Sequence, residues 1–517
     1  MGIVARESIK SSFASYFGLI VGTVNVIFLS TKFLSPDQLG LTKVLQDSTL
    51  LLVSLAQFGS PYIVIRFFPN FYNESTHHNG FLFFMISYNI LSFIIFTIVF
   101  ISLQGFYLGF YLKNSPLIIQ YLWYIIPFVF GTTFINMFES YVILHNKVFF
   151  PNFIREVYLR FSNTIAIILY AIKVIDFTNY IQILAASYLL AVVILIFYIK
   201  KINALFLKPN LSAFNFRQLK PILSYGAFTF AGGIGYLFAT RIDTVMLPAY
   251  KGLTQTAIYS IAVLMATVME IPKKNIVRSV TPFLSFAIKE NDKEKIDDIN
   301  KKTSINLLIF GLLLLLLVWI NINDLYKIIP KGSIYSHGEV VLFLFLLIKL
   351  LDFISGVSNE IVLYSKYYNY AFYLIIALAV LTVTLNIVFI PAFGIVGAAM
   401  ATAISILVYL AIKMWIVWKK FNSHPFNRNM LNAVILFFIV GAISFVLNFA
   451  VQVISPSSIN PFNIKIIASI KILFKSTIIT ALFIFIYKKF NISQEFNNLI
   501  ENIYSRIKNI PTKIYRG

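Results

Sequence analysis

The sequence predicts an all-α integral membrane protein with about 14 transmembrane helices, and its composition carries most of that prediction. Of the 517 residues, 59% are hydrophobic and 12% are charged, whereas an ordinary soluble protein has roughly 25% charged residues. A soluble fold could not cover so much apolar surface, so lipid must be the solvent for most of the chain. The apolar residues also occur in long runs, which is typical of membrane-spanning helices.

Each spanning helix needs about 20 mostly apolar residues, because the hydrocarbon core is about 30 Å thick and an α-helix rises about 1.5 Å per residue. Fourteen segments meet this requirement, and the first is expected to be an uncleaved helix because no small-residue cleavage site follows it. They are predicted at residues 12–30, 45–65, 81–103, 117–144, 153–172, 180–199, 222–240, 257–271, 305–320, 340–364, 370–390, 395–417, 430–454 and 466–486.

The distribution of basic residues orients these helices. The chain has 42 Lys and Arg against 20 Asp and Glu, a net charge of +22. With the N-terminus inside, about 28 of the basic residues fall in cytoplasmic segments and about 9 in the opposite loops, as the positive-inside rule requires. We therefore expect a multi-pass membrane protein with both termini cytoplasmic. The excess charge then serves topology and contact with anionic lipids, so nucleic acid is not an expected partner.

An internal repeat divides the predicted helices into two halves. Leu34-Ser35-Pro36 and Gly40-Leu41-Thr42 precede the second span, and Leu247-Pro248 and Gly252-Leu253-Thr254 precede the eighth. Arg66 and Arg278 each follow 26 residues after the corresponding glycine. The predicted organisation is an N-terminal six-helix lobe at 1–200, a cytoplasmic linker at 201–220, a second six-helix lobe at 221–418, two extra helices at 419–490 and a cytoplasmic tail at 491–517. Parallel repeats of this kind place a substrate site between the two halves.

Several functions are disfavoured by what the sequence lacks. The chain has no cysteine, which excludes disulfides and thiolate metal sites. No glycine precedes a lysine, so a Walker A phosphate loop is absent. Each predicted outer loop has about 20 residues or fewer, too short for a catalytic domain. We expect no catalytic residue, no metal and no cofactor, and therefore no enzyme.

Two polar stretches are predicted at the membrane surface. Residues 103–116 contain Phe106, Tyr107, Phe110 and Tyr111 and are expected to form an interfacial segment on the outer side. Residues 289–302 alternate in charge and are expected to form a solvated cytoplasmic helix.

Four sequence features together resemble a known family. They are residues 6–22, the turn at residues 34–40, Asp243 near the outer end of the seventh span, and the small-residue run at residues 394–402. They look like the polysaccharide transporter family, the Wzx-type flippases of lipid-linked O-antigen and capsule repeat units. That family lies in the multidrug/oligosaccharidyl-lipid/polysaccharide exporter superfamily, with the multidrug and toxic-compound extruders (MATE) and the lipid II flippases. The resemblance implies a protein of the bacterial cytoplasmic (inner) membrane with a MATE-like, V-shaped bundle that alternates between inward-open and outward-open states.

Charged residues inside a bilayer are costly and usually mark a pathway. Local pairs are expected for Lys43 with Asp47, Glu156 with Arg160, Glu270 with Lys273 or Lys274, and Lys349 with Asp352. Six other charged residues have no obvious neighbour on their own helix, namely Arg155, Arg241, Asp243, Glu139, Glu360 and Lys413.

Cations suit the pyrophosphate that the resemblance implies, and arginine can bind phosphate bidentately. The predicted substrate-binding residues are the cations Arg66, Arg155, Arg160, Arg241 and Lys349 and the polar residues Asn25, Gln46 and Asp47. Asp243 and Glu360 are candidates for ion coupling or gating.

The expected function is a flippase that moves an undecaprenyl-pyrophosphate-linked oligosaccharide repeat unit to the outer leaflet by alternating access. Its expected partners are the polyprenyl-pyrophosphate-linked glycan, membrane lipids, and a polysaccharide polymerase with its chain-length machinery. Two alternatives stay open. One is a cation-coupled exporter of small molecules or drugs, in which Asp47, Glu139, Asp243 and Glu360 would matter more than the cations. The other is a membrane enzyme of glycan assembly, which the short outer loops disfavour.

Overall fold

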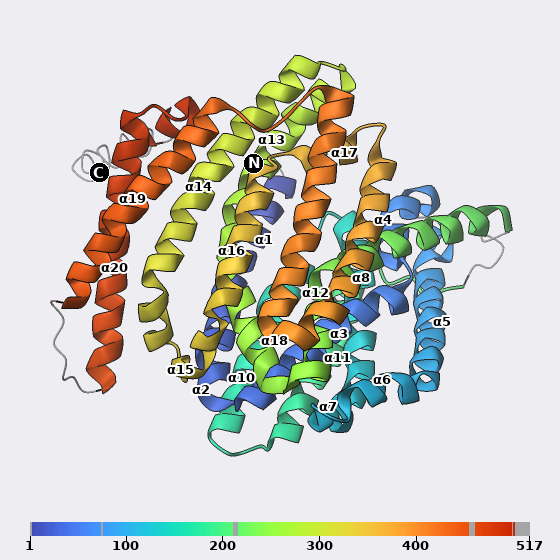
Figure 1. Ribbon diagram of the computed structural model, residues 1–517. Coiled ribbons are helices and arrows are strands. Elements are labelled where there is room, and N and C mark those ends of the chain that lie inside the picture. Colours follow the sequence, from blue (N-terminus) through green and yellow to red (C-terminus); the bar gives the residue numbers. More distant parts are fainter. Residues whose placement is uncertain (1–2, 74–75, 210–215, 454–460, 499, 502–517) are drawn as a thin grey trace, which may run out of the picture. The chain divides into compact units, whose positions relative to one another are not determined.

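The computed structural model describes residues 3–73, 76–209, 216–453, 461–498 and 500–501, and within these ranges the chain is helical with no β-strand (Figure 1). Ten of the described helices are long and apolar enough to cross a membrane, or eleven if one bent pair is counted as a single span. The predicted class, an all-α multi-pass membrane protein, is confirmed. The number of fourteen spans stays a prediction.

The described chain forms two compact units. Unit 1 comprises residues 1–261 and 379–398, and unit 2 comprises residues 262–378 and 399–517. These units are defined by contacts within the chain, and their bounds differ from those of the predicted lobes. The division into two six-helix lobes and two extra helices stays a prediction.

Unit 1 contains the first eleven α-helices and most of the twelfth. They are α1 (Ile3–Thr23), α2 (Thr31–Phe33), α3 (Pro36–Gln57), α4 (Ser60–Phe71), α5 (Phe81–Ser102), α6 (Gln104–Tyr111), α7 (Pro116–Tyr121), α8 (Ile125–Leu144), α9 (Phe149–Phe153), α10 (Leu159–Ala171), α11 (Phe177–Lys201) and α12 (Phe216–Ala266). Short 3₁₀ segments, η2 (His77–Gly80) and η3 (Leu122–Tyr124), and two π-helical segments, η1 (Val24–Ser30) and η4 (Ile154–Tyr158), connect or interrupt them.

The start of α3 follows from the turn that the repeat singled out. Ser35 caps the helix by accepting a hydrogen bond from the Gln38 amide (3.2 Å), and the Gln38 side chain accepts one from the Ser35 amide (2.9 Å). Pro36 suits the first turn because it needs no amide donor there. The span predicted at 45–65 is not one helix, because Phe58 and Gly59 adopt left-handed conformations and separate α3 from α4.

Two glycines break long helices where the sequence predicts boundaries between spans. Gly252 has φ +83° within α12, and Gly394 has φ +61° within α18 (Tyr368–Phe421). Glycine reaches positive φ without the steric penalty of a Cβ atom. The related glycine of the first repeat, Gly40, packs so closely that an added Cβ would lie 2.1 Å from the Leu253 carbonyl oxygen. The two repeat turns therefore contact each other directly within unit 1.

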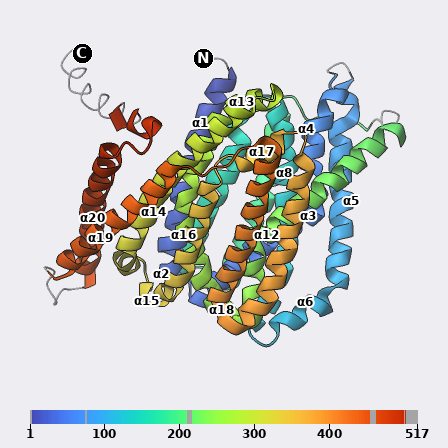
Figure 2. The same cartoon turned by 45° about the horizontal axis from the view of Figure 1, so that its top comes forward.

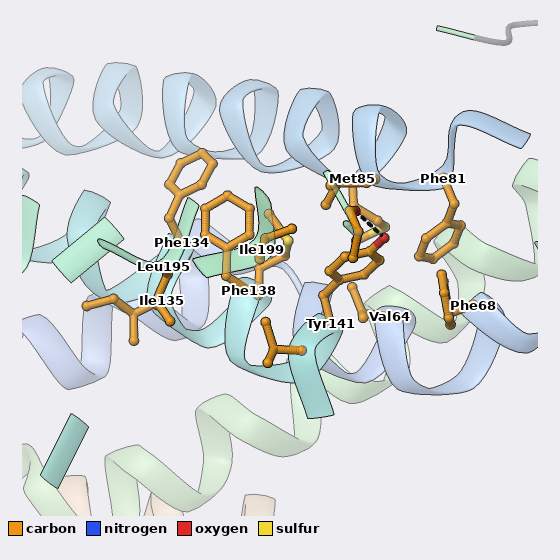
Figure 3. Close-up of a cluster of buried hydrophobic side chains, with 14 of the residues drawn as sticks. Val64, Phe68, Phe81, Met85, Phe134, Ile135, Phe138, Tyr141, Leu195 and Ile199 are labelled. Carbon is orange, nitrogen blue, oxygen red and sulfur yellow. Dashed lines mark hydrogen bonds between the residues drawn. The ribbon is translucent and has the colours of Figure 1, made fainter. Parts of the chain in front are cut away.

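A cluster of buried hydrophobic side chains in unit 1 lies between α4, α5, α8 and α11 (Figure 3). The cluster contains both large aromatic and branched aliphatic side chains. Phe68 packs edge-on against Phe81 and Tyr141. The Tyr141 hydroxyl donates to the Ala204 carbonyl oxygen (2.9 Å), so this buried polar atom is satisfied. Two of these helices also carry charged residues described below, Arg66 on α4 and Glu139 on α8.

Unit 2 contains the remaining helices. They are α13 (Glu270–Lys289), α14 (Lys293–Ile328), α15 (Gly332–Tyr335), α16 (Glu339–Ile354), α17 (Ser358–Tyr364), part of α18, α19 (Arg428–Val453) and α20 (Pro461–Lys489), with the 3₁₀ segments η6 (Thr267–Met269) and η7 (Ser336–Gly338). Helices α19 and α20 lie beside α14 in both views (Figures 1 and 2), and all three share a buried apolar cluster. The span predicted at 340–364 is bent by 55° between α16 and α17.

The segment predicted as one solvated helix at 289–302 spans the end of α13 at Lys289, a short connection at 290–292 and the first residues of α14. Asp292 caps this helix through the Lys295 amide, and Lys301 and Lys302 pair with Asp297 and Asp298 one turn earlier. The helix continues without a break into the apolar run predicted from residue 305, so the polar end and the span form one element.

Candidate functional site

Both π-helical segments of unit 1 carry predicted site residues. Asn25 lies in η1 and donates to the Arg160 carbonyl oxygen (2.7 Å), while its side-chain oxygen accepts from Thr164 (2.8 Å). The wider turn of a π segment frees backbone carbonyls and is often found at functional sites. The buried Asn25 side chain therefore links the first span to α10 by two hydrogen bonds, and it orients the turn that contains Arg160.

Two glycines allow this close approach. A Cβ atom on Gly18 would lie 2.2 Å from the Glu156 carbonyl oxygen, and one on Gly22 would lie 2.9 Å from the Arg160 guanidinium. The Arg160 guanidinium pairs with Glu156 at 2.6 Å, as the sequence predicts. Small residues at such positions let membrane helices pack backbone to backbone.

Arg155 has partners on a different helix. Its guanidinium pairs with Glu139 of α8 and also donates to Asn136 Oδ1 (2.7 Å). Asn136 in turn donates to Gln57 Oε1 (3.0 Å) at the end of α3. Arg155 and Glu139, each without an intrahelical neighbour in the sequence, thus neutralise each other.

Arg241 and Asp243 each have a separate partner, as their spacing of two residues predicts. The Arg241 guanidinium pairs with Asp47 Oδ1 of α3 (3.1 Å), 194 residues away in the chain. Lys43, the predicted partner of Asp47, lies within electrostatic range of Asp47, Arg241 and Arg160. The buried Asp243 accepts hydrogen bonds from the Tyr259 hydroxyl and from the Thr244 amide (2.8 Å).

These eight charged side chains form one electrostatically connected group, which we call the unit 1 charge cluster. Its cations are Lys43, Arg155, Arg160 and Arg241, and its acids are Asp47, Glu139, Glu156 and Asp243. Four of each sign give a formal balance of zero, so this cluster has no surplus of positive charge.

Two predicted residues of unit 1 lie apart from the cluster's ion pairs. Arg66 of α4 stacks on the Tyr225 ring, with its guanidinium carbon 4.2 Å from the ring centroid. Gln46 is half-buried on α3 next to Asp47 in sequence and therefore lies on a different face of that helix.

Unit 2 holds a second charged group, and one predicted pairing there is wrong. Lys349 of α16 pairs with Glu270 Oε1 of α13 (2.7 Å), whereas Asp352 pairs with Lys273 (2.6 Å). Each charged residue pairs with a partner on the facing helix, because that partner lies closer than the charged residue one turn away on its own helix. Lys274 also pairs with Glu270 (3.1 Å), as predicted.

Lys413 of α18 completes this unit 2 charge cluster. It is buried, lies 4.1 Å from the Tyr409 ring centroid and donates to Asn359 Oδ1 (3.4 Å). It is also within electrostatic range of Asp352 and Glu360. Four cations face three acids in the described residues of this cluster, which leaves one positive charge in excess.

The sequence reasoning missed one buried pair. Lys475 of α20, with its side chain 1% exposed, pairs with Asp324 Oδ2 of α14 (2.7 Å) and also donates to Asn448 of α19 (3.0 Å). Lys327 shares the same carboxylate at 3.3 Å. A lysine in the middle of the last predicted span was the available signal, but Asp324 lay beyond the predicted end of its own span.

Comparison with known proteins places the chain in a family. A sequence model described as polysaccharide biosynthesis protein matches residues 4–285, more than half of the chain. The chain belongs to this polysaccharide biosynthesis family. No match was found among curated proteins.

Solved structures support the fold expected for this family member. The structure titled lipid II flippase MurJ, inward closed conformation, covers 93% of this chain and 99% of its own, with 15% identity and a TM-score of 0.69. An inward-facing MATE multidrug resistance transporter of the MOP superfamily covers 78% and 94%, with 14% identity and a TM-score of 0.62. A MOP superfamily transporter from Pyrococcus furiosus covers 81% and 95%, with 12% identity and a TM-score of 0.51. The chain therefore has the fold shared by MurJ and the MATE transporters.

Proposed function

We propose that this polysaccharide biosynthesis family member is a flippase that moves an undecaprenyl-pyrophosphate-linked oligosaccharide repeat unit from the cytoplasmic to the outer leaflet by alternating access. The family match supports a role in polysaccharide synthesis, and the fold supports transport. The substrate headgroup carries phosphates and sugar hydroxyls, which lose their hydration at great cost in hydrocarbon. A protein that lowers this barrier needs charged and polar groups inside the membrane.

The observation that carries the proposal is the presence of three arginines in the unit 1 charge cluster. Arg155, Arg160 and Arg241 each hold an acid through one guanidinium nitrogen that is within ion-pair distance. A guanidinium has five donors, so these arginines retain donors for a phosphate. Lys349 of unit 2 and Arg66 are further candidate contacts, and Asn25, Gln46 and Asp47 are candidate polar contacts.

Complementation tests the proposal. A strain that lacks its own flippase accumulates the lipid-linked repeat unit in the inner leaflet, and expression of this chain is expected to restore surface polysaccharide and clear the intermediate. Failure in several glycan systems, with an intact protein in the membrane, would contradict it. The inner-membrane location, the cytoplasmic termini and the partnership with a polymerase are part of this proposal.

A cation-coupled exporter of small molecules is the second candidate, because Asp243 is a buried acid held by a hydroxyl and a backbone amide. Such a carboxylate suits a coupling ion or gate, and Glu360 of unit 2 is the corresponding candidate there. Gradient-driven drug transport in vesicles, combined with failed complementation, would favour this function. A glycan-assembly enzyme stays the least favoured reading, and we propose that the chain is not an enzyme.

A further inference from the structure

Helix α6 separates two cavities of opposite character within unit 1. Tyr107 and Tyr111, one turn apart, line an apolar cavity of about 260 Å³. Gly109 and Phe110 of the same helix, with Lys113 just beyond its end, line a second cavity of about 450 Å³. In both views α6 runs across the end of the long helix α5 (Figures 1 and 2), as expected of a helix at a membrane interface.

The first cavity is suited to hydrocarbon. Its walls come from α3, α5, α6, η3, α8 and α12, and their side chains are aliphatic or aromatic apart from Ser48 and the hydroxyls of the two tyrosines. The hydroxyls of both tyrosines donate to backbone carbonyls, Tyr107 to Phe100 (3.0 Å) and Tyr111 to Val245 (3.0 Å). A cavity of about 150 Å³ with such walls stays dry and binds benzene. This larger one can therefore hold part of a hydrocarbon chain.

The apolar cavity reaches the lipid-facing surface of α5. Two of its lining residues, Val99 and Leu103, have half of their surface exposed. In a membrane, exposed aliphatic side chains on a spanning helix face acyl chains. A chain from the surrounding bilayer thus has access to the cavity without crossing the polar interior.

The second cavity is suited to an anion. Its described lining includes Lys113 and Lys251 and no acid. Lys251 donates to the Pro391 carbonyl oxygen (3.0 Å), which fixes its position, and Lys113 is exposed. Asn114 donates to the Ala249 carbonyl oxygen (2.7 Å), which holds the two walls together. Basic residues at an interface attract anionic lipid headgroups.

We propose that α6 and its two cavities form a binding site for one anionic glycerophospholipid. The headgroup phosphate contacts Lys113 and Lys251, and one acyl chain occupies the apolar cavity. A free phosphate would use only the cationic cavity and a neutral lipid only the apolar one, whereas an anionic lipid satisfies both at the two faces of one helix. This site is independent of the proposed transport function.

Native mass spectrometry of the intact, delipidated protein tests the site, with dioleoyl phosphatidylglycerol and dioleoyl phosphatidylcholine as probes. We expect one phosphatidylglycerol to be retained at least fivefold more than phosphatidylcholine. Leu55→Trp fills the apolar cavity, and Lys113→Glu reverses the charge that contacts the headgroup. Each variant is expected to lower the ratio of retained phosphatidylglycerol to phosphatidylcholine at least fivefold. Lys113→Arg is expected to keep it.

The matched controls lie on the same elements or the same predicted membrane side. Leu50→Trp adds the same ring to an exposed position of α3, and Lys465→Glu reverses an exposed lysine of α20. If Leu55→Trp fails to fold, Leu52→Trp fills the same cavity. Equal retention of the two lipids, or equal effects of the cavity variants and their controls, would overturn the proposal. So would loss of binding with only one of the two variant types, since the two cavities would then not form one site.

Discussion

At the scale of single residues, several charged side chains of the predicted spans pair with a partner on another helix. Asp47 and Arg241 belong to α3 and α12, Arg155 and Glu139 to η4 and α8, and Lys349 and Glu270 to α16 and α13. The sequence singled out most of these charges, because an apolar run makes a charged residue visible, but it missed the pair of Lys475 and Asp324. It could not predict most of the partners, because spacing along one helix says nothing about the face of another.

Removal of a candidate cation is expected to affect transport rather than folding. Arg241→Ala leaves Lys43 close to Asp47, and Lys349→Ala leaves Lys274 paired with Glu270, so neither acid becomes isolated. A charge-assisted hydrogen bond contributes roughly 1.5–3 kcal/mol, so we expect about 10–100-fold slower flipping with normal membrane expression. Flipping of the lipid-linked repeat unit in proteoliposomes measures this. Lys465→Ala is the control, and wild-type rates in both variants would remove the cation hypothesis.

The pair between Lys475 and Asp324 is expected to behave differently. Asp324→Leu leaves an unpaired buried lysine, which costs about 3–5 kcal/mol when its partner is lost. The double variant Asp324→Leu, Lys475→Met is expected to recover most of that stability. The free energy of unfolding in detergent is measured for these variants and for Lys302→Ala. This control removes the exposed ion pair of Lys302 with Asp298, which contributes under about 0.5 kcal/mol. Equal stability of Asp324→Leu and Lys302→Ala would show that the pair is hydrated.

At the scale of elements, irregular backbone lies where the charged residues are. The π segments η1 and η4 carry Asn25, Arg155 and Glu156, and the left-handed Gly252 lies at the repeat turn. Proline and glycine signals in the sequence predicted the turn and both long-helix breaks. The π segments left no such signal, since they contain neither proline nor glycine, and only the backbone of the structure reveals them.

Gly18 is expected to be intolerant of any side chain. An added methyl would meet the Glu156 carbonyl oxygen, a backbone atom that cannot rotate away. Overpacking of this kind costs about 1–3 kcal/mol, so Gly18→Ala is expected to lower the detergent unfolding temperature and to weaken transport. Gly233→Ala is the control, because nothing lies within 4 Å of its added methyl and alanine favours the helix. Equal melting of the two variants would contradict the tight contact between α1 and η4.

At the scale of the whole molecule, composition alone predicted the structural class, and four loose sequence motifs predicted the family. The described helices support a multi-pass protein, while the orientation rests on the distribution of Lys and Arg. Helix breaks make the count of spans ambiguous, because α12 and α18 each continue through a glycine turn with helical backbone on both sides.

Cysteine labelling measures the orientation directly, since the natural chain has no cysteine to remove. With fourteen spans and both termini inside, Lys208→Cys and Glu290→Cys are expected to react with a membrane-impermeant maleimide only after the cells are permeabilised. Val174→Cys and Lys331→Cys are expected to react in intact cells. All four side chains are exposed, so accessibility within the protein is not limiting. Reaction of all four from the same side would refute the topology.

The equal number of acids and bases in the unit 1 charge cluster has a consequence for how a phosphate would be held. An arriving anion finds every arginine already paired with a carboxylate, so its contact with the remaining N–H donors weakens or displaces an existing ion pair. Only the difference between the old and the new pair then contributes to affinity. Under the proposed function, the carboxylates compete with the substrate phosphate for the arginines, and the original ion pairs form again when the substrate dissociates. Substrate release is thereby favoured without an external counter-ion.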